Sequence, residues 1–154
     1  MRRYLLDTSP LAALLLARPA AVALITPWME RHEAATSILV YAEVVEYIKG
    51  RADFSNRHAH LRTLLGEVYP YFLTYRILER YADLRRRLRP PNGPGLIGDI
   101  DTLIAATALE RNLTLVTTTY LRVRALPGLA WLRGRGGSPE DAERAENRCQ
   151  WSPR

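Results

Sequence analysis

Short apolar segments alternate with helical segments along the chain, and this alternation is the feature that most limits the fold. Strands are predicted at residues 4–6, at a segment ending near 36, and at 69–75, 113–117 and 129–132. Helical segments separate the first four of these strands. Strands that are connected through helices run parallel, and a parallel sheet needs cover on both faces. The sequence therefore predicts an α/β fold built on a central parallel sheet.

The first two helical segments have clear boundary signals. Ser9 is a good N-cap and Pro10 suits the first helical position, so a helix is expected to begin there. A second helix is expected at residues 20–31, where Pro27 removes a backbone donor from the interior. We therefore expect this second helix to be kinked or split at Pro27.

Two of the later helices have apolar faces at helical spacing. Ser37 is expected to cap the first of them and Gly50 to end it. Its predicted buried stripe consists of Val40, Val44, Tyr47 and Ile48. The helix after residues 69–75 is expected to bury Ile77, Tyr81, Leu84 and Leu88. The aromatic side chains of Tyr71, Phe72 and Tyr75 are assigned to the core in preference to a dimer surface.

The length of 154 residues suits one domain with a substantial core. Residues 1–133 carry the alternating pattern, whereas 134–154 are rich in glycine and then in charge, which predicts a polar, flexible tail. Cys149 is the only cysteine, so a reducing cytoplasm is the expected compartment. No apolar segment reaches the length of a transmembrane helix, and no membrane partner is expected.

The chain is basic, with a formal net charge of +6 at pH 7. Four arginines and four acids cancel within residues 134–154, so the excess positive charge lies in residues 1–133. Arginine supplies 21 of the 22 basic residues, and its planar guanidinium suits bidentate contact with phosphate. A polyanionic partner would explain this composition, but an arginine bias of the genome would explain it equally well.

Four acids from three distant segments are predicted to lie at one edge of the sheet. Asp7 directly follows the first strand, and Glu43 lies in the second turn of the helix after the second strand. Asp99 and Asp101 begin the helix that leads into the strand at 113–117. Ligands bind at the carboxyl ends of parallel strands, where these side chains would converge. Carboxylates held together favour a hard cation, so Mg²⁺ is the expected partner and Mn²⁺ an alternative.

Each of these acids also has a purely structural explanation. Asp99 could cap its helix, and Asp101 could complement the helix dipole. Glu43 could be a solvated helix residue. Asp7 is the hardest to explain in this way, because burying a carboxylate after an apolar strand is costly unless something neutralises it. Spacing alone leaves metal binding and these structural roles equally open.

Three runs of the sequence resemble the PIN-domain family, particularly the VapC toxins of bacterial toxin–antitoxin pairs. They are "YLLDTSPL", "TSILVYAEVVEYIKG" and "IGDIDTLIAATALERNLTLVTTTYLRVRALPGLAWL", and the resemblance covers about residues 1–133. It implies a three-layer α/β/α sandwich and a metal-dependent endoribonuclease with an acidic pocket. It also implies a cognate antitoxin partner and a homodimer.

The resemblance assigns roles to the acids residue by residue. Asp7 matches the first metal-binding aspartate of the family, and Glu43 matches its helix glutamate. Asp101 matches the aspartate that precedes the "IAA" signature, and Asp99 matches an additional acid found in part of the family. All four are therefore expected to bind metal and to take part in catalysis.

The resemblance also assigns roles to hydroxyl residues of the site. Thr8 or Ser9 matches a small hydroxyl residue that orients the first acid. After "LVT" the family usually has an acid or amide where this chain has Thr119, which can hydrogen-bond water or phosphate but supplies no charge. Arg122 adds a positive charge close by. This departure puts the second metal site in question.

The expected function is therefore Mg²⁺-dependent endoribonuclease activity, in the toxin of a type II toxin–antitoxin pair. The arginines between residues 85 and 89 either guide the RNA or form a solvated helix face. The alternative is a catalytically weak or inactive PIN-like module that binds RNA or protein, as Thr119 and Arg122 suggest. A phosphoacceptor role for Asp7 is disfavoured, because Lys49 is the only lysine and lies outside the later motifs.

Overall fold

The structure, a computed structural model, describes residues 1–91, 93–118, 126 and 128–133. Five parallel strands form one sheet in the order β3-β2-β1-β4-β5, which confirms the predicted parallel α/β architecture. The strands are β1 (Tyr4–Leu6), β2 (Ala34–Ser37), β3 (Tyr69–Tyr71), β4 (Thr114–Thr117) and β5 (Trp131–Arg133).

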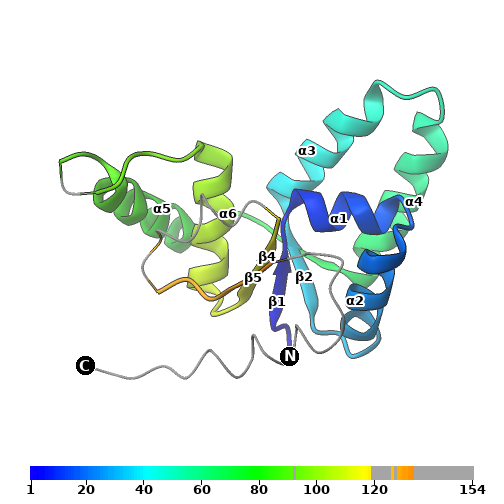
Figure 1. Ribbon diagram of the computed structural model, residues 1–154, viewed down its shortest axis with the longest axis horizontal. Coiled ribbons are helices and arrows are strands. Elements are labelled where there is room, and N and C mark those ends of the chain that lie inside the picture. Colours follow the sequence, from blue (N-terminus) through cyan, green and yellow to red (C-terminus); the bar gives the residue numbers. More distant parts are fainter. Residues whose placement is uncertain (92, 119–125, 127, 134–154) are drawn as a thin grey trace.

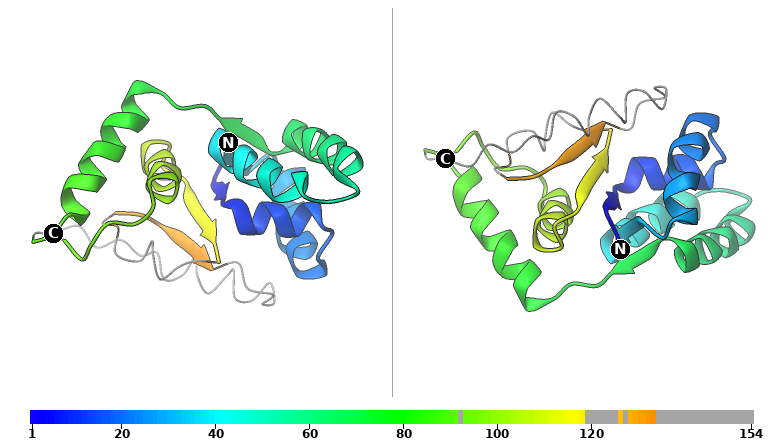
Figure 2. Two further views of the ribbon diagram at one scale, coloured as in Figure 1. Left: turned by 90° about the horizontal axis from the view of Figure 1, so that it is seen from above. Right: turned by 90° about the horizontal axis from the view of Figure 1, so that it is seen from below.

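Six helices cover the two faces of the sheet. They are α1 (Thr8–Leu15), α2 (Pro19–Glu30), α3 (Ile38–Lys49), α4 (Phe54–Glu67), α5 (Tyr75–Leu88) and α6 (Asp99–Glu110). Figure 1 shows α5 and α6 on one side of the sheet and α1 to α4 on the other. The views from above and below in Figure 2 show the same separation, so the expected α/β/α sandwich is confirmed.

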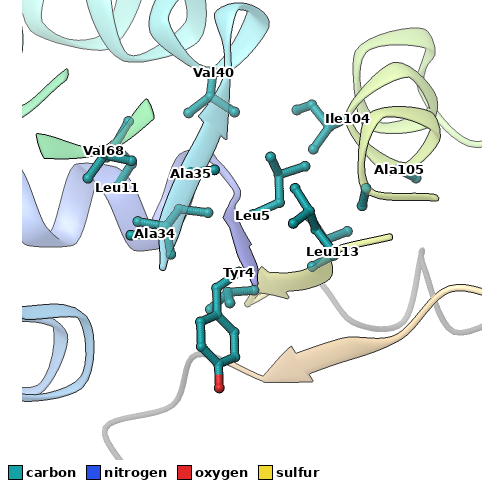
Figure 3. Packing of buried hydrophobic residues seen from close by; sticks show 14 of the residues in the cluster. Tyr4, Leu5, Leu11, Ala34, Ala35, Val40, Val68, Ile104, Ala105 and Leu113 are labelled. Carbon is teal, nitrogen blue, oxygen red and sulfur yellow. The ribbon is translucent and has the colours of Figure 1, made fainter. Parts of the chain in front are cut away.

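The core surrounds β1, whose three residues are all buried between β2 and β4. Figure 3 shows Leu5 near Ala35 of the neighbouring strand and near Ile104 and Ala105 of α6. At the other end of the strand, Tyr4 stacks on Trp28 with ring centroids 4.1 Å apart. A buried strand with partners on both sides gives the chain that follows it a fixed position.

One predicted helix start and the predicted split at Pro27 are corrected. The first helix begins at Thr8 with Asp7 as its N-cap, not Ser9, because the Asp7 carboxylate accepts a hydrogen bond from the backbone N–H of Thr8. The second helix runs unbroken from Pro19 to Glu30 through Pro27.

Other predicted caps and faces are confirmed in part. Ser37 caps α3 through its side chain, and Val40, Val44 and Ile48 are buried as expected. Tyr47 is 50% exposed and does not belong to that stripe. On α5 the buried residues are Ile77, Leu84 and Leu88, while Tyr81 is half-buried against the core.

The prediction that the aromatic side chains after α4 belong to the core is confirmed for Tyr71, which packs against it, and is wrong for Phe72 and Tyr75. The strand ends at Tyr71, and Phe72 and Tyr75 are 63% and 86% exposed. Because β3 lies at the edge of the sheet, only one of its sides is paired, and the chain leaves the sheet as soon as that pairing ends.

Two further predictions concern the tail and the membrane. The tail at 134–154, including Cys149, lies outside the described residues. Within the described part of the chain, no single helix is both long and apolar enough to cross a bilayer. The helices α1 and α2 reach that composition only as a pair, bent by 102°.

Candidate active site

The candidate site lies at the carboxyl ends of the central strands. Asp7 is the first residue after β1, and its backbone N–H donates to the carbonyl of Val116 in β4 at 3.0 Å. The parallel register pairs Leu6 with Val116, so Asp7 and Thr117 leave the sheet side by side. The fold thus places an acid and a hydroxyl from distant parts of the sequence next to each other.

The Asp7 carboxylate is half-buried and held at both oxygens. Its Oδ1 accepts from the backbone N–H of Thr8 at 2.8 Å, and its Oδ2 accepts from the hydroxyl of Thr117 at 2.7 Å. Burial raises the pKa of Asp7 above its ordinary value, although both hydrogen bonds oppose this shift. The charge of Asp101 raises the pKa further. A bound cation would offset both the cost of burying the Asp7 charge and its repulsion by Asp101.

Glu43 reaches the same place from α3. The hydroxyl of Thr8 donates to Oε2 of Glu43, so a single threonine contacts Asp7 through its backbone and Glu43 through its side chain. The sequence offers either Thr8 or Ser9 as the hydroxyl residue of the site. The side chain that contacts an acid here is that of Thr8, whereas Ser9 is exposed. Glu43 is half-buried.

Asp101 comes from the first turn of α6. Its carboxylate lies over Gly98, where an added Cβ would be 3.3 Å from Oδ2 of Asp101. Its negative charge acts on Asp7, which places the two acids in the same electrostatic environment. The structure therefore associates Asp101 with Asp7, and Asp7 with Glu43.

Asp99 is directed to α5 instead. Its side chain is 64% exposed, and its Oδ1 lies 2.9 Å from a guanidinium nitrogen of Arg85. The hydroxyl of Tyr81 donates to the same oxygen at 3.0 Å, and this bond raises the pKa of Tyr81. The proposed metal role of Asp99 thus competes with an ion pair and a hydrogen bond that already occupy its carboxylate.

The chemistry of the side chains fits a hard divalent ion. Asp7, Glu43 and Asp101 offer only carboxylate oxygens, which Mg²⁺ and Mn²⁺ prefer. Across the described ranges, no three Asp, Glu, His or Cys side chains already stand in an arrangement that could hold a metal ion. Asp7 is thus linked to Glu43 through Thr8 and to Asp101 through its charge, and the three acids do not form a closed set of ligands.

Local sequence patterns do not indicate one residue of the site, and two of the predicted residues lie outside the described part of the chain. The sequence predicts Thr117 only as the end of a strand, although its position beside Asp7 follows once β1 and β4 are paired in register. Thr119 and Arg122 lie outside the described residues. Their predicted roles stay predictions.

Comparison with known proteins agrees with this architecture. No curated protein matches the chain. A chain in the structure of VapBC2 from Rickettsia felis bound to promoter DNA has a TM-score of 0.74 at 21% identity, covering 84% of this chain and 97% of that one. For DNA-bound VapBC from Salmonella typhimurium the TM-score is 0.76 at 15% identity, with coverage of 88% and 100%. For VapBC-5 from Mycobacterium tuberculosis it is 0.63 at 24% identity, with coverage of 86% and 99%.

These likenesses establish a shared fold. The family assignment itself comes from the sequence, because the family model described as PIN domain matches residues 4–120. That match includes every acid of the candidate site, from Asp7 to Asp101. The chain belongs to the PIN domain family.

Proposed function

We propose that this protein is a divalent-metal-dependent endoribonuclease and the toxin of a toxin–antitoxin pair. The observation that carries the proposal is the half-buried carboxylate of Asp7 at the end of β1. It is linked to Glu43 through Thr8, and the negative charge of Asp101 raises its pKa. Burying a carboxylate near a like charge is costly unless a cation is bound. Phosphodiester hydrolysis is a chemistry that such a bound cation supports.

The roles of the residues follow from their positions. Asp7, Glu43 and Asp101 would hold Mg²⁺ or Mn²⁺, which supplies Lewis-acid stabilisation of the phosphate and lowers the pKa of a bound water. Thr117 and Thr8 fix the orientation of the Asp7 carboxylate by donating to its two oxygens. The hydroxyl of Thr8 does the same for Glu43.

A polyanionic substrate is supported by the charge of the chain. The net charge is +6, and Arg86, Arg87 and Arg89 are exposed on and after the last turn of α5. Exposed arginines attract phosphate without selecting a sequence, and they make binding sensitive to salt. Arg85 is less available for this purpose, because it is paired with Asp99.

The proposed protein partners rest on the structural neighbours and on one surface. The three structures compared above are of VapBC complexes, which supports a cognate antitoxin for this chain. Phe72, Tyr75 and Leu78 are exposed near the start of α5, and exposed apolar side chains of this size suit contact with another chain. A homodimer, in a cytoplasmic setting, remains part of the proposal.

A second candidate function is a binding module that holds RNA without cutting it. The observation in its favour is Thr119, a neutral residue where the resembled family usually has an acid or amide. Such a module would bind RNA equally well with or without Mg²⁺.

A cleavage assay separates the two functions. The purified chain, freed of any bound antitoxin, is incubated with RNA in Mg²⁺, in Mn²⁺ and with a chelator. We expect cleavage only with metal, and we expect Glu43→Gln to abolish it. The matched control is Glu46→Gln, an exposed glutamate on the same helix, which should cut as the wild type does. RNA binding without cleavage in either metal would favour the binding module.

A further inference from the structure

Arg85 of α5 contacts the chain on both sides of Gly98, the residue that precedes α6. Its Nη1 lies 2.9 Å from Oδ1 of Asp99 and donates to the carbonyl of Ile97 at 3.3 Å. One turn earlier on α5, Tyr81 donates its hydroxyl to the same Asp99 oxygen at 3.0 Å. The Arg85 guanidinium also lies 6.0 Å from the centre of the Tyr81 ring. Two side chains of α5 thus hold the beginning of α6.

The beginning of α6 needs such support because it has no side-chain cap. Its N-cap is Gly98, which has no side chain to accept a hydrogen bond from the first turn. The turn is closed by Thr102, whose backbone N–H and hydroxyl donate to the carbonyl of Gly98 at 2.9 and 2.8 Å. Contacts from α5 therefore hold this turn through Ile97 and Asp99, although they accept no hydrogen bond from its backbone N–H groups.

The position of Asp101 depends on this turn. Its carboxylate lies over Gly98, close enough that an added Cβ there would be 3.3 Å from Oδ2. Arg85 holds the residues directly before and after Gly98. A shift of this peptide segment would therefore move the carboxylate of Asp101 relative to Asp7.

The contacts of Arg85 are not explained by stability alone. Asp99 is 64% exposed and Arg85 is 24% exposed, and an ion pair with one solvated partner contributes little to the stability of the fold. A weakly stabilising contact can still select one orientation of a helix end. Groups that orient metal ligands in this way affect metal affinity without touching the metal.

We propose that Arg85 and Tyr81 position Asp101 through Asp99, so that Asp99 orients the site instead of binding the ion. This inference rests on the proposed function, because it assumes that Asp101 is a metal ligand. It differs from the prediction that all four acids are ligands. It also makes Arg85 a positioning residue and separates it from the arginines that attract RNA.

Binding of Mn²⁺, measured by electron paramagnetic resonance without RNA, tests the inference. We expect Arg85→Ala to weaken Mn²⁺ binding about tenfold, the lower end for residues that orient ligands. Tyr81→Phe should weaken it less, and it serves as the second variant if Arg85→Ala folds poorly. The matched control is Arg86→Ala, which removes the same charge from an exposed position on the same helix and should bind as the wild type does.

The alternative role of Asp99 predicts the opposite result. If Asp99 were a ligand, Arg85→Ala would free its carboxylate, and Mn²⁺ would bind as tightly as in the wild type or more tightly. Asp99→Asn would then be far more damaging than Arg85→Ala. Under our proposal the two variants lose similar affinity, and the double variant loses little more, because both break the same contact. Wild-type affinity in Arg85→Ala overturns the inference.

Amide hydrogen exchange distinguishes a failure of the positioning role of Arg85 from a failure of the proposed function. The N–H of Thr102 should exchange several-fold faster in Arg85→Ala than in Arg86→Ala, because the first turn of α6 loses its support. Equal exchange in the two variants overturns the positioning role. If the wild type binds no Mn²⁺, the proposed function fails and the metal role of Asp101 fails with it. Thr102 exchange then still decides whether Arg85 holds the helix.

Discussion

The hydroxyl of Thr117 donates a 2.7 Å hydrogen bond to Oδ2 of Asp7, across 110 residues of sequence. This contact exists because β1 and β4 are parallel neighbours and end at the same level. Oδ1 of the same carboxylate is held by the N–H of Thr8. Both oxygens of Asp7 therefore have a fixed orientation before any ion binds.

Replacing Thr117 by valine tests the importance of that orientation. The shape of the side chain is kept, but Asp7 loses a donor that lowers its pKa, so its pKa should rise further. We expect RNA cleavage to fall about tenfold and to need a higher pH. The lost bond should also cost about 1 kcal/mol of unfolding free energy.

The control for this change is Thr118→Val, at the next residue, which is exposed. Cleavage rates are compared over a range of pH at saturating Mg²⁺. Equal rates and equal pH profiles for the two variants would show that the hydroxyl of Thr117 has no part in the site.

Thr8→Val tests the link between Asp7 and Glu43. The backbone contact to Asp7 remains, whereas Glu43 loses its hydroxyl donor. We expect the Mg²⁺ concentration for half-maximal cleavage to rise severalfold, because a freed glutamate must be ordered again when the ion binds. The exposed Ser9 offers a comparison, and Ser9→Ala should have the smaller effect. A larger effect at Ser9 would mean that the hydroxyl roles are reversed.

The pH dependence of stability follows from the raised pKa of Asp7. Since burial raises this pKa, the folded chain holds a proton more tightly than the unfolded chain does, whose value is near 3.8. The contribution of Asp7 to stability therefore falls as pH rises through the interval between the two values, and it stays low above it. Asparagine caps a helix as well as aspartate does, so Asp7→Asn keeps the N-cap and removes the charge.

With a chelator present, Asp7→Asn should be more stable than the wild type at pH 7. The difference should shrink as the pH is lowered, because the Asp7 carboxyl, whose pKa is raised by burial, takes up a proton in the folded wild type. Urea unfolding at several pH values measures this directly. A wild type that is more stable than Asp7→Asn at pH 7 without metal would refute the cost assigned to this buried charge.

Much of the fold could be predicted from local patterns. Ser37 and Gly50 mark the ends of α3 because caps depend on residues next to the helix. The exposure of Phe72 and Tyr75 could not be predicted in this way. It depends on β3 being an edge strand, which is a property of the whole sheet.

The candidate site was predictable to a similar extent. Local patterns predict Asp7, Glu43 and Asp101 at the same edge of the sheet, because each lies directly after a strand or within the first two turns of a helix. Asp99 has the same local setting as Asp101, and no local pattern indicates that it pairs with Arg85, fourteen positions earlier on another helix. The role of Thr117 likewise depends on strand register, which only the folded chain defines.

The central claim is that Asp7, Glu43 and Asp101 together bind a divalent cation. It is tested most directly by isothermal titration of the metal-free chain with Mn²⁺, in the wild type and in Asp7→Asn, Glu43→Gln and Asp101→Asn. Our account predicts saturable binding to the wild type and a large loss of affinity in each variant, with Glu46→Gln unchanged. Absence of Mn²⁺ binding to the folded wild type, or wild-type affinity in Asp7→Asn, would contradict it.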